Sequence, residues 1–365
     1  MQSIDQLLEV NPYELDKVSK REYLNTRLHE LTRHHYENCD EYRRMVDAYA
    51  YGLDINNLPD YDKLPFLPVR LFKEFELRSC AKEDVVKTMT SSGTTGQQVS
   101  RILLDRDTSS AQTKCLTRIV SDFLGTKRVP MLILDSSSVI KNRAMFSARG
   151  AGILGFSMFG SKRQYALDEN MELDIEGMKV FLENHKDETI FLFGFTFMVW
   201  QHFYKKLLES GYKPDLSKGI LIHGGGWKKL ISEQVSPEQF KYNLNAVCGI
   251  LPENVHDYYG MVEQTGTIYM ECECGHLHTS SYSDVIIRRT CDFSIAKNGE
   301  EGLIEVVSIL PESYPGHVLL TEDKGIVLGE DDCPCGRKGK YFKIIGRIKN
   351  AEIRGCSDTY ATKFK

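Results

Sequence analysis

The sequence predicts an α/β protein in which helices cover a parallel sheet, with a helical region before the sheet and a β-rich part after it. Short apolar runs of strand length occur at 129–134, 189–193 and 219–222, and amphipathic stretches with helical spacing separate them. Strands that alternate with helices are typical of a parallel sheet. From Glu271 onward, short strand-like segments joined by turns replace the helical stretches, which predicts a β-rich subdomain.

Residues 1–80 are expected to form a helical N-terminal region and a connector. Leu24, Leu28 and Leu31 fall at i, i+4 and i+7, which places them on one face of a helix. The stretch 64–73 contains two prolines. Because proline lacks an N–H and restricts the residue before it, this stretch is expected to be extended rather than helical.

Three further segments follow the connector. Residues 81–270 are expected to form the α/β core, which would bind a nucleotide if the motifs below have that role. Residues 271–345 are expected to form the β-rich subdomain, and residues 346–365 a hinge motif and a short tail. We find no internal repeat and no low-complexity linker in the sequence.

Composition excludes several classes of protein. The 365-residue chain has a formal net charge of −5 that is not gathered into a block, so no nucleic-acid partner is expected. No apolar run approaches the roughly 20 residues of a membrane span. The N-terminus lacks the basic and then apolar plan of a signal peptide. We therefore expect a cytoplasmic protein whose ten cysteines are reduced thiols or metal ligands.

A loop rich in glycine and hydroxyl residues follows the connector. Its members are Thr90, Ser91, Ser92, Gly93, Thr94, Thr95 and Gly96. Glycine lets backbone N–H groups approach a ligand closely, and short hydroxyl side chains add donors, so the loop can wrap phosphate oxygens. No Gly-Lys-Ser/Thr follows, so it is not a Walker A loop. The alternative is a flexible surface loop.

The second informative stretch is 256–264, in which a strand ends at a glycine turn. Tyr258 and Tyr259 precede Gly260 and can stack on a base, and Glu263 can ligate Mg²⁺ that bridges phosphates. A strand-to-turn junction with a helix-capping glutamate is the alternative.

A third motif follows the apolar run at 219–222. It consists of His223, Gly224, Gly225 and Gly226. Three glycines at a strand end permit the close approach of a flat ligand. A simple glycine turn into the next helix is the alternative.

Two Cys-x-Cys pairs lie in the β-rich part. They are Cys272 with Cys274, and Cys333 with Cys335, and His276 and His278 follow the first pair. Four thiolates are a sufficient set for a tetrahedral structural zinc ion, with no open position for catalysis. Four reduced thiols in β-turns are the alternative.

These motifs resemble, in the same order, those of the adenylate-forming superfamily of acyl-CoA synthetases, adenylation domains and luciferases. The resemblance implies that the glycine loop holds ATP phosphates and that Tyr259 and the turn at 223–227 hold adenine. It also implies that Asp323 holds the ribose hydroxyls and that Arg347 contacts ribose or phosphate. Val262 stands where the superfamily usually has threonine. Such enzymes usually continue into a small mobile domain. Here ten residues follow Gly355, so that domain is expected to be missing or vestigial.

The closest resemblance is to the acyl-protein synthetase (LuxE-like) branch. It covers nearly the whole chain and includes Pro-Val-Arg-Leu-Phe-Lys at 68–73 and His-Gly-Gly-Gly-Trp-Lys at 223–228. In that family a fatty acid is adenylated with ATP, and the acyl group passes to a cysteine near the C-terminus and then to a partner acyl reductase. Cys356 stands at the matching place. An inert tail thiol is the alternative for this residue.

We therefore expect an ATP- and Mg²⁺-dependent ligase that activates a carboxylic acid as an acyl-adenylate and passes the acyl group to a protein thiol. Its expected catalytic residues are Glu263, Arg347 and Cys356. One rival is a ligase that acylates CoA or a carrier protein, as phenylacetate-CoA ligases acylate CoA. Another is an inactive, zinc-stabilised nucleotide-binding protein.

Overall fold

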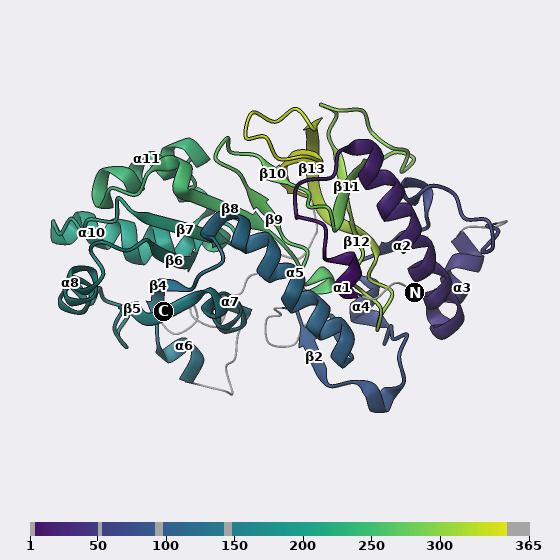
Figure 1. Ribbon diagram of the computed structural model, residues 1–365, viewed down its shortest axis with the longest axis horizontal. Coiled ribbons are helices and arrows are strands. Elements are labelled where there is room, and N and C mark those ends of the chain that lie inside the picture. Colours follow the sequence, from purple (N-terminus) through teal and green to yellow (C-terminus); the bar gives the residue numbers. More distant parts are fainter. Residues whose placement is uncertain (1–3, 50–52, 92–97, 142–147, 349–365) are drawn as a thin grey trace.

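A computed structural model describes residues 4–49, 53–91, 98–141 and 148–348 of the chain (Figure 1). The helices are α1 Ile4–Leu7, α2 Lys17–Asn38, α3 Asp40–Tyr49, α4 Leu71–Glu74, α5 Arg106–Leu124, α6 Ser138–Lys141, α7 Ala148–Phe156, α8 Ile175–Asn184, α9 Thr196–Met198, α10 Lys205–Ser210 and α11 Pro237–Cys248. The strands are β1 Leu67–Pro68, β2 Lys87–Thr90, β3 Arg101–Leu104, β4 Val129–Ser136, β5 Gly160–Leu167, β6 Ile190–Phe195, β7 Gly219–Gly224, β8 Val255–Tyr259, β9 Tyr269–Glu271, β10 Leu277–His278, β11 Ser283–Arg288, β12 Gly302–Ser308, β13 Val318–Glu330 and β14 Lys340–Arg347.

One large sheet runs through the molecule in the order β11-β12-β13-β14-β10-β9-β8-β7-β6-β4-β5. Strands β4 to β8 pair in parallel, as predicted from the three apolar runs. From β8 to β9 the pairing becomes antiparallel, and it stays so through β10, β14, β13, β12 and β11. The α/β prediction is confirmed, and the β-rich part continues the same sheet.

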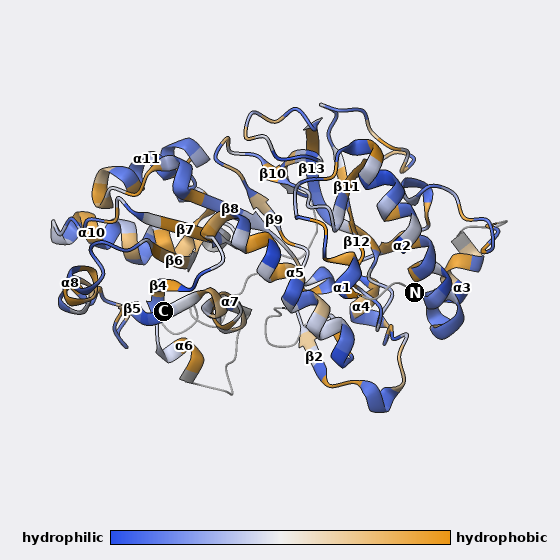
Figure 2. Ribbon diagram, in the orientation of Figure 1, coloured by the Kyte–Doolittle hydropathy of each residue, from blue (hydrophilic) through white to orange (hydrophobic). Residues whose placement is uncertain are grey.

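Both faces of the parallel half are covered. Alternate residues of its strands point to opposite sides of the sheet, and each side packs into a core of its own. Leu132 and Leu192 belong to a core with the segment from η5 (Val199–Tyr204) to α11. Met131 and Phe191 belong to a second core with α5 and α7. Burial on both sides explains why these strands read as continuous apolar runs. Figure 2 shows β6 and β7 as largely hydrophobic ribbons.

The N-terminal region packs against the antiparallel half (Figure 1). Leu67 of β1 pairs in parallel with Leu319 of β13, so the connector is part of the large sheet. The expectation that 64–73 contains no helix was wrong at its end, where α4 begins at Leu71. Both prolines precede this helix, so neither interrupts it.

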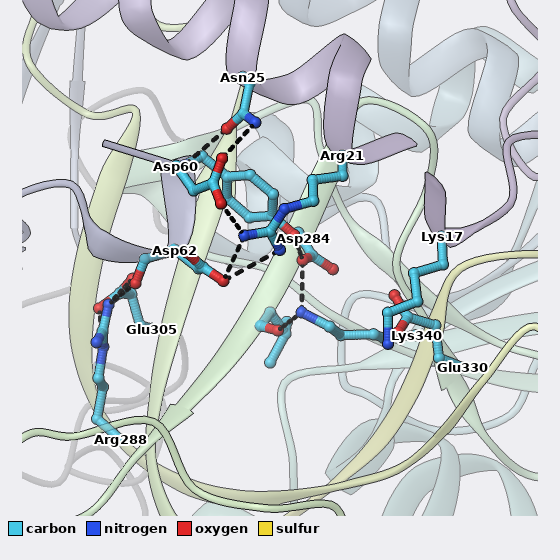
Figure 3. Close-up of polar contacts among 12 residues, drawn as sticks. Lys17, Arg21, Asn25, Asp60, Asp62, Asp284, Arg288, Glu305, Glu330 and Lys340 are labelled. Atoms are coloured by element: carbon cyan, nitrogen blue, oxygen red, sulfur yellow. Dashed lines mark hydrogen bonds and ion pairs between the residues drawn. The ribbon is translucent and has the colours of Figure 1, made fainter. Parts of the chain in front are cut away.

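A buried polar network joins the N-terminal region to the β-rich part (Figure 3). The carboxylate of Asp284 accepts hydrogen bonds from the Tyr61 hydroxyl at 2.5 Å and from Lys340 Nζ at 2.6 Å. Lys20 Nζ of α2 lies 3.6 Å from the same carboxylate and donates to Thr279 Oγ1 at 2.7 Å. Buried charges are tolerated when they are paired in this way. Among the described helices, none is long and apolar enough to cross a bilayer.

Candidate active site

A cavity of about 830 Å³ lies where the parallel and antiparallel halves of the sheet meet. The carboxyl ends of β6, β7 and β8 contribute to it, and in parallel sheets ligands bind beyond these ends. The predicted site residues that line it are Thr90, Ser91, His223, Gly225, Gly226, Tyr258, Tyr259, Gly260, Glu263, Asp323 and Arg347. Motifs spread over more than 250 residues therefore share one cavity.

Some predicted residues lie elsewhere. Gly224 is not among the lining residues, but a Cβ at this position would fall 2.5 Å from the Tyr258 ring, so glycine lets the ring pack on β7. The loop residues Ser92, Gly93, Thr94, Thr95 and Gly96, and the tail residue Cys356, lie outside the described residues.

The base of the glycine loop is fixed next to Glu263. The Ser91 N–H donates to the Ser100 carbonyl at 3.2 Å, and the Ser100 N–H donates to Ser91 Oγ at 2.9 Å. The Ser100 hydroxyl in turn donates to Glu263 Oε1 at 2.6 Å. Tyr314 holds the backbone at the same point, with its hydroxyl donating to the Glu263 carbonyl at 2.9 Å. The buried Glu263 carboxylate and the start of the loop are therefore held together.

A second polar group lies on β13 and β14. Asp323 and Arg347 are register partners, and Arg347 Nε lies 3.1 Å from Asp323 Oδ1. The Tyr259 hydroxyl donates to Asp323 Oδ2 at 2.8 Å. Burial and the negative charge of Asp323 raise the pKa of Tyr259 well above its ordinary value, so the hydroxyl stays protonated. Tyr259 therefore links β8 to the carboxylate that the sequence predicts at the ribose.

An aromatic wall of the cavity is formed by rings of β8, α7 and the end of β7. The Tyr258 ring centroid lies 5.2 Å from that of Phe156 of α7. His223 Nδ1 is hydrogen-bonded to Thr196 Oγ1 at 3.0 Å. Burial lowers the pKa of His223 to about 3, so this imidazole is neutral and acts as a polar wall rather than a cation. A flat, uncharged ring fits between such groups.

Three charged residues of the cavity have no sequence signal of their own. Lys241 Nζ of α11 lies 3.2 Å from Glu271 Oε1. Glu271 Oε2 accepts the Asp257 N–H at 2.9 Å. All three line the cavity, and the Asp257 side chain is about half exposed. The motifs give none of them a role, because only the folded sheet brings Lys241 and Glu271 next to Asp257, which lies within the stretch 256–264.

Four side chains of types that can ligate a metal ion lie together next to the cavity wall. Ligand atoms of Cys272, His278, Cys333 and Cys335 all lie within 4.8 Å of one another. Cys272 Sγ is 3.9 Å from Cys333 Sγ, and His278 Nε2 is 3.4 Å from Cys335 Sγ. Three thiols and one imidazole fit a tetrahedral zinc ion.

The four side chains that the structure groups differ from the predicted four at one position. Cys274 is exposed and lies outside the group. The Gly275 N–H donates to the Cys272 carbonyl at 2.9 Å, and this tight turn carries Cys274 at its tip. His278 of β10 takes the fourth place. The histidines after the first cysteine pair were the signal for it in the sequence.

Comparison with solved structures identifies the class of protein. The fold is similar to that of 2-hydroxyisobutyryl-CoA ligase in complex with 2-HIB-AMP and CoA, with a TM-score of 0.67, 14% identity, and coverage of 94% of this chain and 78% of the other. A second structure of that ligase, in the postadenylation state, gives a TM-score of 0.68 at 13% identity over 92% of this chain and 69% of the other. The fold is that of adenylate-forming enzymes.

Sequence comparison identifies the family. The chain belongs to the family described as acyl-protein synthetase, LuxE, which it matches over residues 1–365. A long-chain-fatty-acid–luciferin-component ligase of Vibrio harveyi is 23% identical over 99% of this chain and 93% of its own length. The ligase of the same name from Aliivibrio fischeri is 23% identical over 97% and 92%. The resemblance inferred from the motifs is confirmed, and the protein is a ligase of this family.

Proposed function

We propose that this ligase activates a long-chain fatty acid with ATP and Mg²⁺ and passes the acyl group to a protein thiol. The observation that carries the proposal is the single cavity shared by the base of the glycine loop, Glu263, and the Asp323–Arg347 pair. The fatty-acid class is supported by the name of the relatives from Vibrio harveyi and Aliivibrio fischeri, long-chain-fatty-acid–luciferin-component ligase.

In the first step, a carboxylate oxygen of the acid attacks the α-phosphorus of ATP. A P–O bond forms, the bond from the α-phosphorus to the bridging oxygen breaks, and pyrophosphate leaves with the electron pair. Glu263 would ligate Mg²⁺, which neutralises charge on the phosphates. Arg347 would add a fixed positive charge near the nucleotide, and the remaining catalysis would be positioning.

The nucleotide would lie across the sheet. The adenine ring would be held by Tyr258, Tyr259 and the glycine turn that begins at Gly224. The Asp323 carboxylate would accept hydrogen bonds from the ribose hydroxyls. Asp257, which is missing from the motif-based prediction, would accept a hydrogen bond from the exocyclic amine of adenine. Lys241 supports this arrangement through Glu271, whose other oxygen accepts the Asp257 N–H.

In the second step, a thiolate attacks the acyl carbon of the acyl-adenylate. A C–S bond forms, the bond from the acyl carbon to the phosphate oxygen breaks, and AMP leaves with the electron pair. Cys356 would supply the thiol. It follows Arg347, a residue of the cavity wall, by nine positions, and nine extended residues span up to about 30 Å. The chain length therefore suffices for transfer within one molecule. An acyl reductase, a carrier protein or CoA would then accept the acyl group.

We also propose that Cys272, His278, Cys333 and Cys335 hold a structural zinc ion. Three thiolates and one imidazole leave no open coordination position, so the ion would have no catalytic role. Reduced thiols agree with the cytoplasmic location that we propose, because cytosolic thiols are not oxidised to disulfides.

The proposal is tested by pyrophosphate release with ATP, Mg²⁺ and fatty acids. Glu263→Gln should lower acid-dependent release by about 100-fold or more, since it removes a metal ligand from the reacting phosphates. Glu253→Gln, the same change at an exposed position outside the cavity, is the matched control and should match the wild type. Wild-type levels of release in Glu263→Gln would refute the role of this residue.

The acyl acceptor is tested by intact mass after turnover. The proposal expects an acyl adduct on the wild-type chain and none on Cys356→Ser. Release without any adduct, together with thioester formation on added CoA by both proteins, would instead establish the CoA ligase rival.

A further inference from the structure

Helix α7 contains three glycines, which do not favour a helix. Its nine residues are Ala-Arg-Gly-Ala-Gly-Ile-Leu-Gly-Phe, so glycine occurs at 150, 152 and 155. Glycine is among the least favourable residues in a helix interior, because the unfolded chain gives up more freedom and no side chain packs. Each glycine of this helix therefore calls for a reason in its surroundings.

Gly152 has such a reason within the protein. A Cβ at this position would lie 2.9 Å from Cζ of Phe195, the last residue of β6. On the other side, a Cβ at Gly225 would lie 2.7 Å from Cδ1 of the same ring. The Phe195 ring is therefore enclosed between two glycines, one on α7 and one on the turn after β7. Close packing of the helix on the sheet accounts for Gly152.

Gly155 has no such reason. It lies three residues after Gly152, on the same face of the helix, and it lines the cavity. A Cβ built here meets no atom of the described residues within 4 Å. Gly155 therefore weakens the helix without making room for a described neighbour. It leaves open space at the wall of the cavity.

Apolar side chains line the same cavity as Gly155. Phe156 follows Gly155 in the chain, Phe195 packs on Gly152, and Leu116 of α5 and Ile268 are also lining residues. None of these side chains can hydrogen-bond the polar part of a nucleotide, whereas all can contact an alkyl chain. The apolar wall and the polar wall at Asp323 and Arg347 belong to one cavity, as an acyl-adenylate requires.

Helix α7 is also fixed in place. Arg149, in its first turn, pairs with Asp135 of β4 at 3.1 Å between Nε and Oδ2, and both side chains are buried. The stacked rings of Phe156 and Phe193, with centroids 4.3 Å apart, hold its last residue. A larger side chain at 155 would therefore fill the cavity rather than displace the helix.

We propose that Gly155 sets the length of the alkyl chain that the enzyme accepts, because the chain passes over the bare face of α7 at this residue. The inference rests on the proposed function and assigns Gly155 as a specificity-determining residue of the same site. A side chain at 155 takes the place of methylene groups of a long acid but leaves the room that a short acid uses.

The experiment compares acid-dependent pyrophosphate release for hexanoic, decanoic and hexadecanoic acid in the wild type, Gly155→Ala and Gly155→Leu. We expect the ratio of kcat/KM for hexadecanoic to hexanoic acid to fall about threefold in Gly155→Ala and more than about tenfold in Gly155→Leu, since each methylene group excluded costs roughly fourfold in binding. Leu154→Phe is the matched control. It enlarges an exposed neighbour on α7 that does not line the cavity, so the ratio should not change.

Thermal unfolding of the same proteins checks that they fold. Gly155→Ala should have a Tm equal to or above that of the wild type, because alanine favours the helix and meets no neighbour. Folded Gly155 variants with the wild-type ratio, or with an equal loss for all three acids, would overturn the inference. If the wild-type protein releases no pyrophosphate with any of the acids, the proposed function itself is refuted. The two failures are therefore distinct.

Discussion

Ser100 and Glu263 are 163 positions apart in the sequence, yet one hydrogen bond of 2.6 Å joins their side chains. The carboxylate that we assign to Mg²⁺ thus receives its orientation from the residue that closes the glycine loop. A hydrogen bond to a charged group is stronger than one between neutral groups. Serine at 100 therefore positions Glu263 for its role, although no motif contains it.

At the same scale, buried histidines make stability depend on pH. The rings of His35 and His317 lie 4.8 Å apart between centroids, and both are buried. Burial, and then the charge of Arg27, lowers the pKa of His317 to about 3, and burial lowers that of His35 as well. In the unfolded chain a histidine has a pKa of about 6.5. Below that pH the unfolded state binds protons that the folded state does not, so stability falls on acidification.

Urea unfolding at pH 7.5 and pH 5.5 measures this effect. We expect the free energy of unfolding to be lower at pH 5.5, by about 1 kcal/mol for each such histidine. His317→Asn should lose less on acidification than the wild type, by about that amount. His29→Gln, at a partly exposed position on the same helix as His35, should keep the wild-type loss. An unchanged loss in His317→Asn would contradict the assignment.

Short motifs predicted residues that share one cavity, and they did not reach the partners that the fold supplies. The roles expected of Thr90, Ser91 and Glu263 follow from short motifs, and these residues do share a cavity, although their roles stay predictions. Lys241 could not be found, because an isolated charged residue in a sequence is ordinarily a solvated surface residue. Asp257 lies within the stretch 256–264, but nothing in that motif gives its carboxylate a role. Only the sheet brings them to one wall.

At the scale of elements, the metal-binding group joins two hairpin turns. Cys272 directly follows β9, and Cys333 and Cys335 lie between β13 and β14. His278 pairs with Tyr341, and the neighbouring pair, Leu277 with Phe342, lines the cavity. An ion here would fix the same strands that carry the nucleotide wall.

We predict about one equivalent of zinc per chain in the purified protein, measured by elemental analysis. Cys335→Ser should lose the metal and lower the free energy of unfolding by more than about 3 kcal/mol, because a bound structural ion contributes directly to folding. Cys291→Ser, the same change at an exposed cysteine outside the group, is the control and should keep both. A protein without bound metal, or with metal retained in Cys335→Ser, would exclude this ligand set.

Element prediction was accurate for strands buried on both faces and poorer elsewhere. Segments 129–134, 189–193 and 219–222 became β4, β6 and β7 because continuous apolar character is the signature of a central parallel strand. Strand β5 was missed, since it lies at the sheet edge and has exposed residues in its middle. The pairing of β1 with β13 was beyond reach, because no local pattern encodes a partner so distant in the sequence.

At the scale of the whole molecule, the network around Asp284 connects the N-terminal region to the large sheet. Asp284→Asn would leave the buried Lys20 ammonium and the partly exposed Lys340 ammonium near a neutral group. Removing one partner of a buried charge group typically costs about 3–5 kcal/mol. Burial already lowers the pKa of Lys20 to about 8, which shows how strongly this site disfavours an unpaired cation.

Urea unfolding at pH 7 tests this prediction. Asp284→Asn should be less stable than the wild type by about 3 kcal/mol or more. Lys17→Ala, which removes the exposed Lys17–Glu330 pair of the same region, should change stability by less than about 1 kcal/mol. Equal effects of the two substitutions would mean that the buried network is no more important than a surface ion pair.

The pairing of Leu67 with Leu319 also bears on how the protein is made. During synthesis, the connector emerges from the ribosome about 250 residues before its partner strand. At 5–20 residues per second, this delay is about 12–50 s. During that time α2 has no sheet to pack on. Its residues Lys20, Arg27 and His35 are buried only in the folded protein. Helix α2 is thus translated before the strands that it packs on, and it reaches its native surroundings only after they emerge.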